Sequence, residues 1–420
     1  MYIVGVFYSL LVLVSANYES YKVYSVIPAN RTHIELLGLL LSTDKLDFWS
    51  RLSYDSRSVD IMVPPQEQRD FIMYLKKHDI QYEVLIDNLE TVIQREHVKQ
   101  QLIPRTFRGK ISFSKYNTFN DINAYLYQLQ MDYHNLVKLQ NIGTTYEKRG
   151  MVVIQISSNP SANNPIIFID GGIHAREWIA PAQVLYIINQ LVENPANRDL
   201  LDDVDWHILP VANPDGYEYS QTINHRMWRK TRSQQAKNCM GTDANRNFEF
   251  YWGLSGASSN PCADTYKGPK PFSEVETQNL RDYLLKIKKN AKLYLTFHSY
   301  GNLILYPWGY TSELPHDEFE LRTLAKEVND AIVKAGGPSY TIGSSTNVLY
   351  AAAGGSDDWA KGVAGIELSY TIELPGGKKN GFDIPANEIL KVVNQTFAGM
   401  IVYGKYISVK YKDTWRFPEK

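Results

Sequence analysis

A histidine and a glutamate, three residues apart, follow a short apolar run that ends at two glycines. The run covers residues 166–169, and the pair is His174 and Glu177. An apolar run bounded by Asn-Asn-Pro and Gly-Gly is typical of a buried strand, and open α/β sheets bind ligands at the carboxyl ends of their strands. Imidazole and carboxylate are both zinc ligands, and a catalytic zinc takes three protein ligands with one position left open. The pair could therefore bind a metal, or form an ordinary salt bridge in a solvated loop.

Two later apolar runs end in groups of the same chemistry, His298 and Glu373. If these runs are strands of one sheet, their ends meet at the same edge. His174, Glu177 and His298 would then form a zinc site with an open fourth position. Glu373 would be left beside the metal, where a carboxylate could take a proton from water. Taken singly, the histidine could be a packed strand-end residue and the glutamate a surface carboxylate.

Two clusters of arginine follow the first motif, a basic run at residues 226–233 and the triplet Asn-Arg-Asn around Arg246. Arginine binds a carboxylate through two parallel hydrogen bonds, so Arg246 could hold the free C-terminus of a substrate. Arg229 could polarise a carbonyl group and stabilise the oxyanion that forms from it. The alternative for the basic run is a solvated loop.

Length and charge limit the classes of protein to consider. The chain has 420 residues and a net charge of −1, which suggests two or three domains and gives no electrostatic indication of nucleic acid or a membrane surface. Residues 1–16 are apolar, too short to span a bilayer, and end in Val-Ser-Ala, as a signal peptidase requires. We predict a cleaved secretory signal there, with a buried strand as the alternative. In an oxidising compartment Cys239 and Cys262 would most simply form one disulfide, with two free thiols as the alternative.

The elements that must position these groups fall into two units. Strand and helix patterns in the first hundred residues predict a compact α+β unit, followed by a linker with Arg105, Arg108 and Lys110. Such an extended, basic linker is open to a trypsin-like protease, or is an ordinary connection between domains. Beyond it, strands alternate with helices, which predicts a mixed, mainly parallel sheet with helices on both sides.

Three local signals in the second unit predict element boundaries. Pro181 is expected to be the first residue of a helix, where no amide is lost. Ser273 and Glu276 have the spacing of a capping box that opens another helix. Residues 213–216, Asn-Pro-Asp-Gly, are typical of a turn.

Taken together, these motifs resemble the secreted metallocarboxypeptidases of the pancreatic A/B type, from about residue 21 to residue 403. The motifs that carry the resemblance are Gly-Ile-His-Ala-Arg-Glu-Trp around His174, Asn-Pro-Asp-Gly at 213–216, Trp-Arg-Lys-Thr-Arg at 228–232, Asp-Ala-Asn-Arg-Asn at 243–247, Phe-His-Ser-Tyr at 297–300, Tyr350 with Gly-Gly-Ser at 354–356, and Glu373-Leu374.

The resemblance implies a role for each of these residues. One Zn²⁺ per chain would bind to His174, Glu177 and His298, with Glu373 as general base. The other implied roles are Arg229 and Arg176 at the scissile carbonyl and the preceding residue, Asn245, Arg246 and Tyr350 at the terminal carboxylate, and Ser299 and Tyr300 among the substrate-binding residues.

The resemblance also implies the fold and the processing of the chain. The expected catalytic domain, residues 111–420, is an α/β/α sandwich with a mixed eight-stranded sheet. Residues 17–110 would be an inhibitory propeptide with a small α+β, ferredoxin-like fold, removed by a trypsin-like protease. Cys239 would pair with Cys262.

Asp357 bears on substrate specificity. In the family that the chain resembles, this position lies at the bottom of the pocket for the C-terminal side chain, and an acid there resembles the B-type enzymes, which remove Lys or Arg. A buried carboxylate without a partner is costly, so a cationic side chain is its natural complement. Gly309, Ser345 and Pro375 depart from the B-type pattern, and the alternative is A-type preference for apolar C-terminal residues.

The resulting hypothesis is a digestive zinc exopeptidase, made as a zymogen, secreted and monomeric. Its expected partners are peptide and protein C-termini, a trypsin-like activating protease and protein inhibitors of carboxypeptidases, without nucleic acid or membrane. A second hypothesis is an inactive secreted binding protein on the same fold. A third, a serine hydrolase, is disfavoured because the sequence has no Gly-x-Ser-x-Gly elbow.

Overall fold

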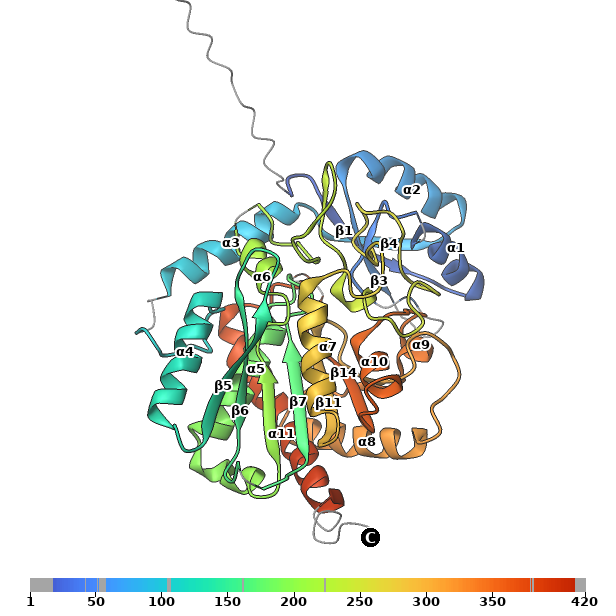
Figure 1. Cartoon of the computed structure of the whole chain (residues 1–420). Helices are drawn as coiled ribbons and strands as arrows, with labels where there is room; N and C mark the ends of the chain where they lie inside the picture. Colours follow the sequence, from blue (N-terminus) through green and yellow to red (C-terminus); the bar gives the residue numbers. More distant parts are fainter. Residues whose placement is uncertain are drawn as a thin grey trace, which may run out of the picture.

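The structure, a computed structural model, describes residues 18–41, 43–50, 52, 58–103, 107–160, 162–222, 224–377, 379 and 381–411. The predicted secretory signal and Arg105 of the linker lie outside these ranges. Within the described ranges, no helix has both the length and the apolar character that crossing a membrane requires. Figure 1 shows a small N-terminal unit, in blue, that lies against one end of a larger unit.

The small unit is a four-stranded antiparallel sheet, in the order β2-β3-β1-β4, with helices on one face. Tyr24 and Val26 pack beneath these helices. Val23, on the opposite face, packs in a cluster with Tyr300 and Phe382 of the larger unit, so both faces of the sheet are apolar. The elements are β1 (Lys22–Ile27), α1 (Arg31–Leu41), β2 (Asp47–Phe48), β3 (Val59–Val63), α2 (Gln68–Lys77), β4 (Gln81–Ile86) and α3 (Leu89–Leu102).

The large unit is built on the mixed eight-stranded sheet that the sequence predicts, in the order β13-β12-β14-β11-β7-β8-β6-β5. Its centre is parallel, from β14 through β11 and β7 to β8, whereas β12 and β6 run antiparallel to their inner neighbours. The strands are β5 (Val137–Thr144), β6 (Gly150–Ile156), β7 (Ile166–Gly171), β8 (Asp205–Leu209), β11 (Ala291–Ser299), β12 (Leu303–Tyr306), β13 (Thr341–Ser344) and β14 (Leu368–Leu374).

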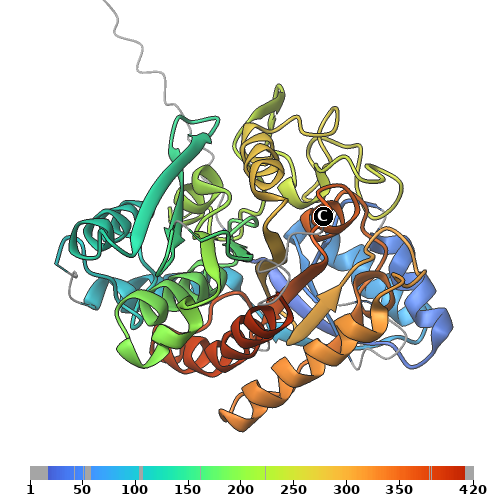
Figure 2. The ribbon, with the colours of Figure 1, turned by 60° about the horizontal axis from the view of Figure 1, so that its bottom comes forward.

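Helices cover both faces of this sheet, because its strands are apolar on both sides. Ile167 and Ile169 of β7 belong to one hydrophobic cluster, and Ile166 and Phe168 belong to a second cluster on the other face. Figure 2 shows α11 and α8 side by side in the first layer. That layer holds α4 (Phe119–Asp132), α5 (Ile179–Val192), α8 (Glu318–Lys334) and α11 (Ala386–Tyr411), and the second holds α7 (Val275–Ile287) and α10 (Ser356–Gly362).

Two of the predicted local features differ in the structure. Helix α5 begins at Ile179, so Pro181 is its third residue. A proline is tolerated there because the first four amides of a helix have no partner within it. The expected turn at residues 213–216 is the start of α6 (Pro214–Ser220), whose first turn Asn213 caps by accepting a hydrogen bond from the Gly216 amide at 3.0 Å.

The predicted capping box at the start of α7 is also wrong. Glu274 is the residue before the helix, and its side chain makes no capping hydrogen bond. Its carboxylate accepts a hydrogen bond from the Thr231 hydroxyl at 2.6 Å instead. The two residues expected to form the box are engaged elsewhere. The Ser273 hydroxyl accepts a hydrogen bond from Nδ2 of Asn247 at 2.9 Å, and Glu276 accepts from the Tyr146 amide at 2.9 Å. Contacts with distant segments therefore take the side chains that a local motif would use.

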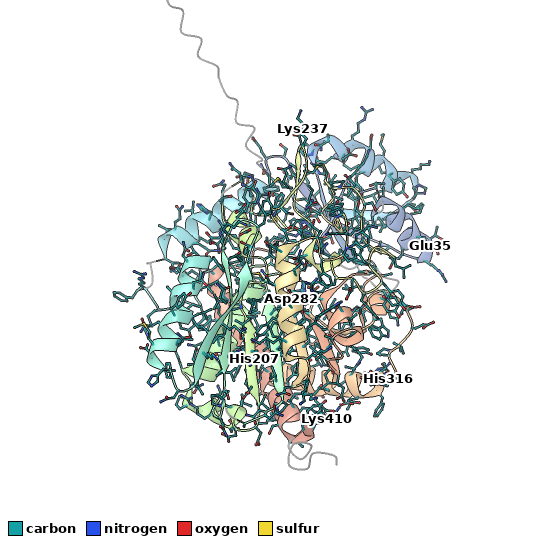
Figure 3. All side chains as sticks on the ribbon, in the orientation of Figure 1. Glu35, His207, Lys237, Asp282, His316 and Lys410 are labelled. Carbon is teal, nitrogen blue, oxygen red and sulfur yellow. A yellow bond between two sulfur atoms is a disulfide. The ribbon has the colours of Figure 1, made fainter. Side chains whose placement is uncertain are left out.

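The predicted disulfide is confirmed. Cys239 and Cys262 are bonded, with their Cα atoms 4.9 Å apart. The bond joins the hairpin of β9 (Gln234–Ala236) and β10 (Cys239–Met240) to a loop that also carries Asp264. Lys237, in the turn of this hairpin, lies at the end of the molecule opposite Lys410 of α11 (Figure 3).

Candidate active site

The carboxyl ends of three neighbouring strands bring together four of the predicted chemical groups. His298 of β11 lies directly opposite Glu373 of β14 in the parallel register. On the other side of β11, β7 ends at Gly171. Gly172 has φ +67°, and a Cβ there would lie 2.8 Å from the ring of Pro181. Only glycine allows this close turn over α5, which returns His174 to the strand ends.

His174, Glu177 and His298 form a compact cluster of potential metal ligands. One ligand atom from each lies within 4.8 Å of the others, and all three residues are buried. The carboxylate of Glu177 lies 2.8 Å from Nδ1 of His174 and 3.1 Å from Nδ1 of His298. The two Nδ1 atoms are themselves 3.1 Å apart. Two ring nitrogens and a buried carboxylate that converge in this way fit a shared Zn²⁺, which imidazole and carboxylate both bind.

Asp243 supports this cluster from behind. Its Oδ1 lies 3.2 Å from Nε2 of His174, so the Nδ1 atom of that ring is the one that faces the cluster. Its Oδ2 accepts hydrogen bonds from Nε and Nη2 of Arg229 at 3.1 and 2.9 Å. Burial opposes ionisation of this carboxyl, but Arg229 and His174 hold the pKa of Asp243 well below its usual value. A fixed anion therefore orients both a cluster histidine and an arginine. Asp243 belongs to the Asp-Ala-Asn-Arg-Asn motif at 243–247, but its role was not predicted from the sequence.

Glu373 lies beside the cluster and lines the same cleft. Its Oε2 is buried and has no hydrogen-bond partner among the described residues. Burial raises the pKa of Glu373 to about 7, against the opposing effect of the positive charges on His298 and Arg229. A carboxyl group that titrates near neutrality is suited to exchange protons with a substrate.

The cleft around this centre has room for about 110 Å³ of solvent. Every site residue predicted from the sequence lines it. These residues are His174, Arg176, Glu177, Arg229, Asn245, Arg246, His298, Ser299, Tyr300, Tyr350, Asp357 and Glu373.

Arg246 lines the cleft with a guanidinium group that is held by backbone carbonyls. Its guanidinium donates to backbone carbonyls, from Nε to Gly256 at 2.9 Å and from Nη1 to Asn245 at 2.8 Å. Among the described residues it forms no ion pair. Asn245 is fixed as well, because its Oδ1 accepts a hydrogen bond from the Ser356 amide at 2.9 Å. The pair could hold a small anion such as a carboxylate.

Asp357 presents an unbalanced negative charge to the same cleft. Only 6% of its surface is exposed. Its Oδ2 accepts hydrogen bonds from the hydroxyls of Thr371 at 3.1 Å and Ser345 at 3.4 Å, and within the described part of the chain no cation pairs with it. Two hydroxyls compensate only part of the cost of burying a carboxylate.

The small unit, which the resemblance implies to be inhibitory, closes this cleft from outside, through residues that were not predicted from the sequence. Phe48, Trp49 and Ser50 line the cleft together with the residues of the large unit. Arg176 donates two hydrogen bonds to the carboxylate of Asp47, which precedes them. The signal in the sequence was weak, because β2 has only two residues and no apolar period.

Tyr300, predicted to bind substrate, also contacts the small unit. Its hydroxyl donates a hydrogen bond to Oδ2 of Asp60 at 3.1 Å, and its ring lies 5.1 Å from that of Phe382. Trp49 also packs on Phe382, at 5.2 Å between ring centroids. Two predicted substrate contacts, Arg176 and Tyr300, are therefore occupied by the chain itself.

Comparison with known families gives two matches. Residues 122–399 match the family described as zinc carboxypeptidase. Residues 24–96 match the family described as carboxypeptidase activation peptide.

Individual relatives agree with these matches. Carboxypeptidase B of Astacus astacus is 48% identical over 308 residues, which cover 73% of this chain and all of that protein. The crystal structure of carboxypeptidase A from Helicoverpa armigera has a TM-score of 0.88 at 31% identity and covers 94% of this chain and 99% of its own. Bovine thrombin-activatable fibrinolysis inhibitor in complex with tick carboxypeptidase inhibitor has a TM-score of 0.67 at 35% identity, over 71% of this chain and 99% of its own.

Proposed function

The chain belongs to the zinc carboxypeptidase family and carries an activation peptide, and on this basis we propose that it removes lysine or arginine from the C-termini of peptides. The preference for lysine or arginine is supported by the position of Asp357. Its carboxylate is buried in the cleft, and no cation pairs with it in the described part of the chain. A cationic side chain from a substrate would neutralise it. An apolar side chain would leave it unpaired, at a cost of several kcal/mol.

His174, Glu177 and His298 are the proposed zinc ligands. When bound there, zinc would supply a Lewis acid that polarises the scissile carbonyl and makes water more acidic. The approach of the two Nδ1 atoms to one carboxylate supports this ligand set. Asp243, through Nε2 of His174, would keep that ring in the orientation that the ligand role requires.

Glu373 is the proposed general base. Ionised, it would take a proton from the attacking water, and it would then deliver a proton to the nitrogen of the leaving residue as the carbon–nitrogen bond breaks. Its unpartnered oxygen and its raised pKa support both steps. Arg229, fixed by Asp243, would stabilise the negative charge that develops on the carbonyl oxygen.

Recognition of the chain end is proposed to use a second set of groups. Arg246, which forms no ion pair with a described carboxylate, would bind the terminal carboxylate with Asn245 and Tyr350. Arg176, Ser299 and Tyr300 would contact residues that precede the scissile bond. All of these residues line the cleft, and an exopeptidase needs such an anion site to select the last residue.

The activation peptide, proposed to be residues 17–110, would inhibit by occupying this cleft. Trp49 and its neighbours fill the approach, and Asp47 neutralises Arg176. A trypsin-like protease would release it by cutting between Arg105 and Lys110. Arg108 and Lys110 are exposed, as a protease site must be.

We further propose that the protein is secreted and acts in a digestive fluid, where trypsin-like proteases are available to activate it. The disulfide supports passage through an oxidising compartment. The tick inhibitor bound to bovine thrombin-activatable fibrinolysis inhibitor supports the proposal that protein inhibitors also bind to this cleft.

A panel of peptides that differ only in the last residue tests the proposal on the trypsin-cleaved chain. We expect the highest kcat/KM for C-terminal lysine or arginine. A preference for phenylalanine or leucine would instead indicate A-type specificity, which the apolar side chains of Leu305 and Leu349 in the same cleft would favour. Zinc binding without turnover of any peptide would indicate an inactive binding protein.

A further inference from the structure

Strand β11 carries three polar side chains on one face. Successive side chains of a strand point to opposite sides, so Tyr294, Thr296 and His298 share a side. The neighbouring parallel strand, β7, places Asp170 directly opposite Thr296. The sheet register therefore sets a carboxylate against the strand that ends in a proposed zinc ligand.

Asp170 is fully buried, and both of its carboxylate oxygens accept hydrogen bonds from this strand. The Thr296 hydroxyl donates to Oδ1 at 2.7 Å, and the Tyr294 hydroxyl donates to Oδ2 at 2.6 Å. The oxygen of Thr296 also lies 3.2 Å from Nε2 of His298. Asp170, Thr296 and His298 therefore form a continuous hydrogen-bonded path from the carboxylate to the imidazole.

The single hydroxyl hydrogen of Thr296 decides which group donates each hydrogen bond along this path. A threonine hydroxyl has one hydrogen, and Thr296 donates it to the carboxylate of Asp170. Thr296 can therefore only accept a hydrogen bond from His298, so the proton of this imidazole is on Nε2. In the neutral ring, which is the form that binds a metal, Nδ1 then carries the lone pair, and this atom lies 3.1 Å from both Nδ1 of His174 and Oε2 of Glu177. This is the tautomer that a metal ligand needs.

We propose that Asp170, acting through Thr296, is a positioning residue that holds His298 in its metal-binding tautomer and orientation. Asp243 contacts His174 directly, whereas Asp170 reaches His298 through one hydroxyl. The proposal rests on the proposed ligand set. It adds two residues that touch neither substrate nor metal.

The test is the affinity of the full-length chain for zinc, measured on metal-free protein by competition with a coloured chelator. Thr296→Val keeps the shape of the side chain and removes the hydroxyl that links Asp170 to His298, which we call the relay. We therefore expect zinc to bind about ten to a hundred times more weakly. Thr296→Ser keeps the hydroxyl and should restore an affinity close to that of the wild type.

Tyr294→Phe is the matched control. It removes the other hydroxyl from Asp170 and leaves the path to His298 whole. Both Thr296→Val and Tyr294→Phe leave one buried oxygen of Asp170 unpaired, so both should lower the melting temperature of the metal-free chain. Only Thr296→Val should weaken zinc binding.

Three results would overturn the relay: Thr296→Val binds zinc as tightly as the wild type, Thr296→Ser fails to restore binding, or Tyr294→Phe loses as much affinity as Thr296→Val. Failure of the ligand set itself is distinguishable, because the wild-type chain would then bind no zinc with the stoichiometry of one per chain. In that case both proposals fall.

Discussion

Asp47 and Arg176 are joined across the boundary between the two units by two hydrogen bonds, of 2.5 Å from Nη1 and 2.9 Å from Nη2. Arg176 is buried, and its next acidic neighbour, Asp264, lies 3.6 Å away. A paired, desolvated charge of this kind is costly to leave without its partner. The contact therefore ties the activation peptide to a residue that we assign to substrate binding.

Replacing Asp47 should loosen the inhibited state. In Asp47→Asn the bidentate acceptor is lost, and we expect the docking of the small unit to weaken by about 2 kcal/mol or more. The uncut chain should then cleave a short peptide that ends in lysine faster than the uncut wild type. Asp44→Asn is the control, because Asp44 contacts the large unit through an exposed hydrogen bond to Ser258. Equal rates for Asp47→Asn and wild type would remove this contact from the inhibitory mechanism.

Asp357 should set the specificity. Asp357→Asn keeps the shape of the pocket and removes its charge, so a substrate lysine would be buried without an anion. We expect kcat/KM for C-terminal lysine to fall by about a hundredfold or more, while kcat/KM for C-terminal leucine changes little. Paired assays of two peptides with a common upstream sequence measure this difference. Parallel losses on both peptides would contradict the assignment.

Glu373 should control the acid side of the pH profile. Burial raises the pKa of its carboxyl to about 7, and only the ionised form can accept a proton. Activity should therefore rise with pH through this pKa, at or below 7, because a bound Zn²⁺ would favour the ionised form. Glu373→Gln should lower kcat by about 10²- to 10⁴-fold and keep zinc. Loss of zinc in this variant, or an unchanged rate, would argue against a general base.

Glu96 should make docking of the activation peptide dependent on pH. It is buried on α3, where its Oε1 accepts a hydrogen bond from the Ala386 amide at 3.2 Å. Burial raises its pKa above the usual 4.5, with the nearby Asp383 adding to the effect. The docked form holds the proton more tightly than the free peptide, so docking is strongest below pH 4.5 and weakens as pH rises through the docked pKa.

Release of the cleaved peptide measures this dependence. In chain cut at the linker, gel filtration between pH 5 and pH 8 should show more free peptide at the higher pH. Glu96→Gln mimics the protonated form and should flatten the curve, although Asp60, whose pKa burial also raises, would leave a residual slope. Identical curves for wild type and Glu96→Gln would exclude this role.

The central sheet and the zinc cluster could be predicted from the sequence because each depends on local patterns. The run that forms β7, the two glycines after it and the His-x-x-Glu spacing all lie within twelve residues. His298 and Glu373 stand at the ends of apolar strands, and parallel strands bring such ends together. The motif at 243–247 likewise keeps Arg246 near Asn245 without help from distant segments.

What the sequence did not predict depends on contacts between distant segments. β2 has two residues and forms only because β3 lies beside it. Asp47 reaches Arg176 across 129 positions of the chain, and no local pattern marks either as a partner. Asp170 and Thr296 are linked by the register of β7 and β11. The capping box predicted from Ser273 and Glu276 failed for the same reason, since Asn247 contacts Ser273 and Tyr146 contacts Glu276.

Release of C-terminal lysine by the trypsin-cleaved chain, measured before and after zinc is removed and returned, tests the central claim most directly. The proposed mechanism predicts that a chelator abolishes lysine release and that one equivalent of Zn²⁺ per chain restores it. Lysine release that continues in metal-free protein, or none in protein that holds one zinc per chain, would contradict it.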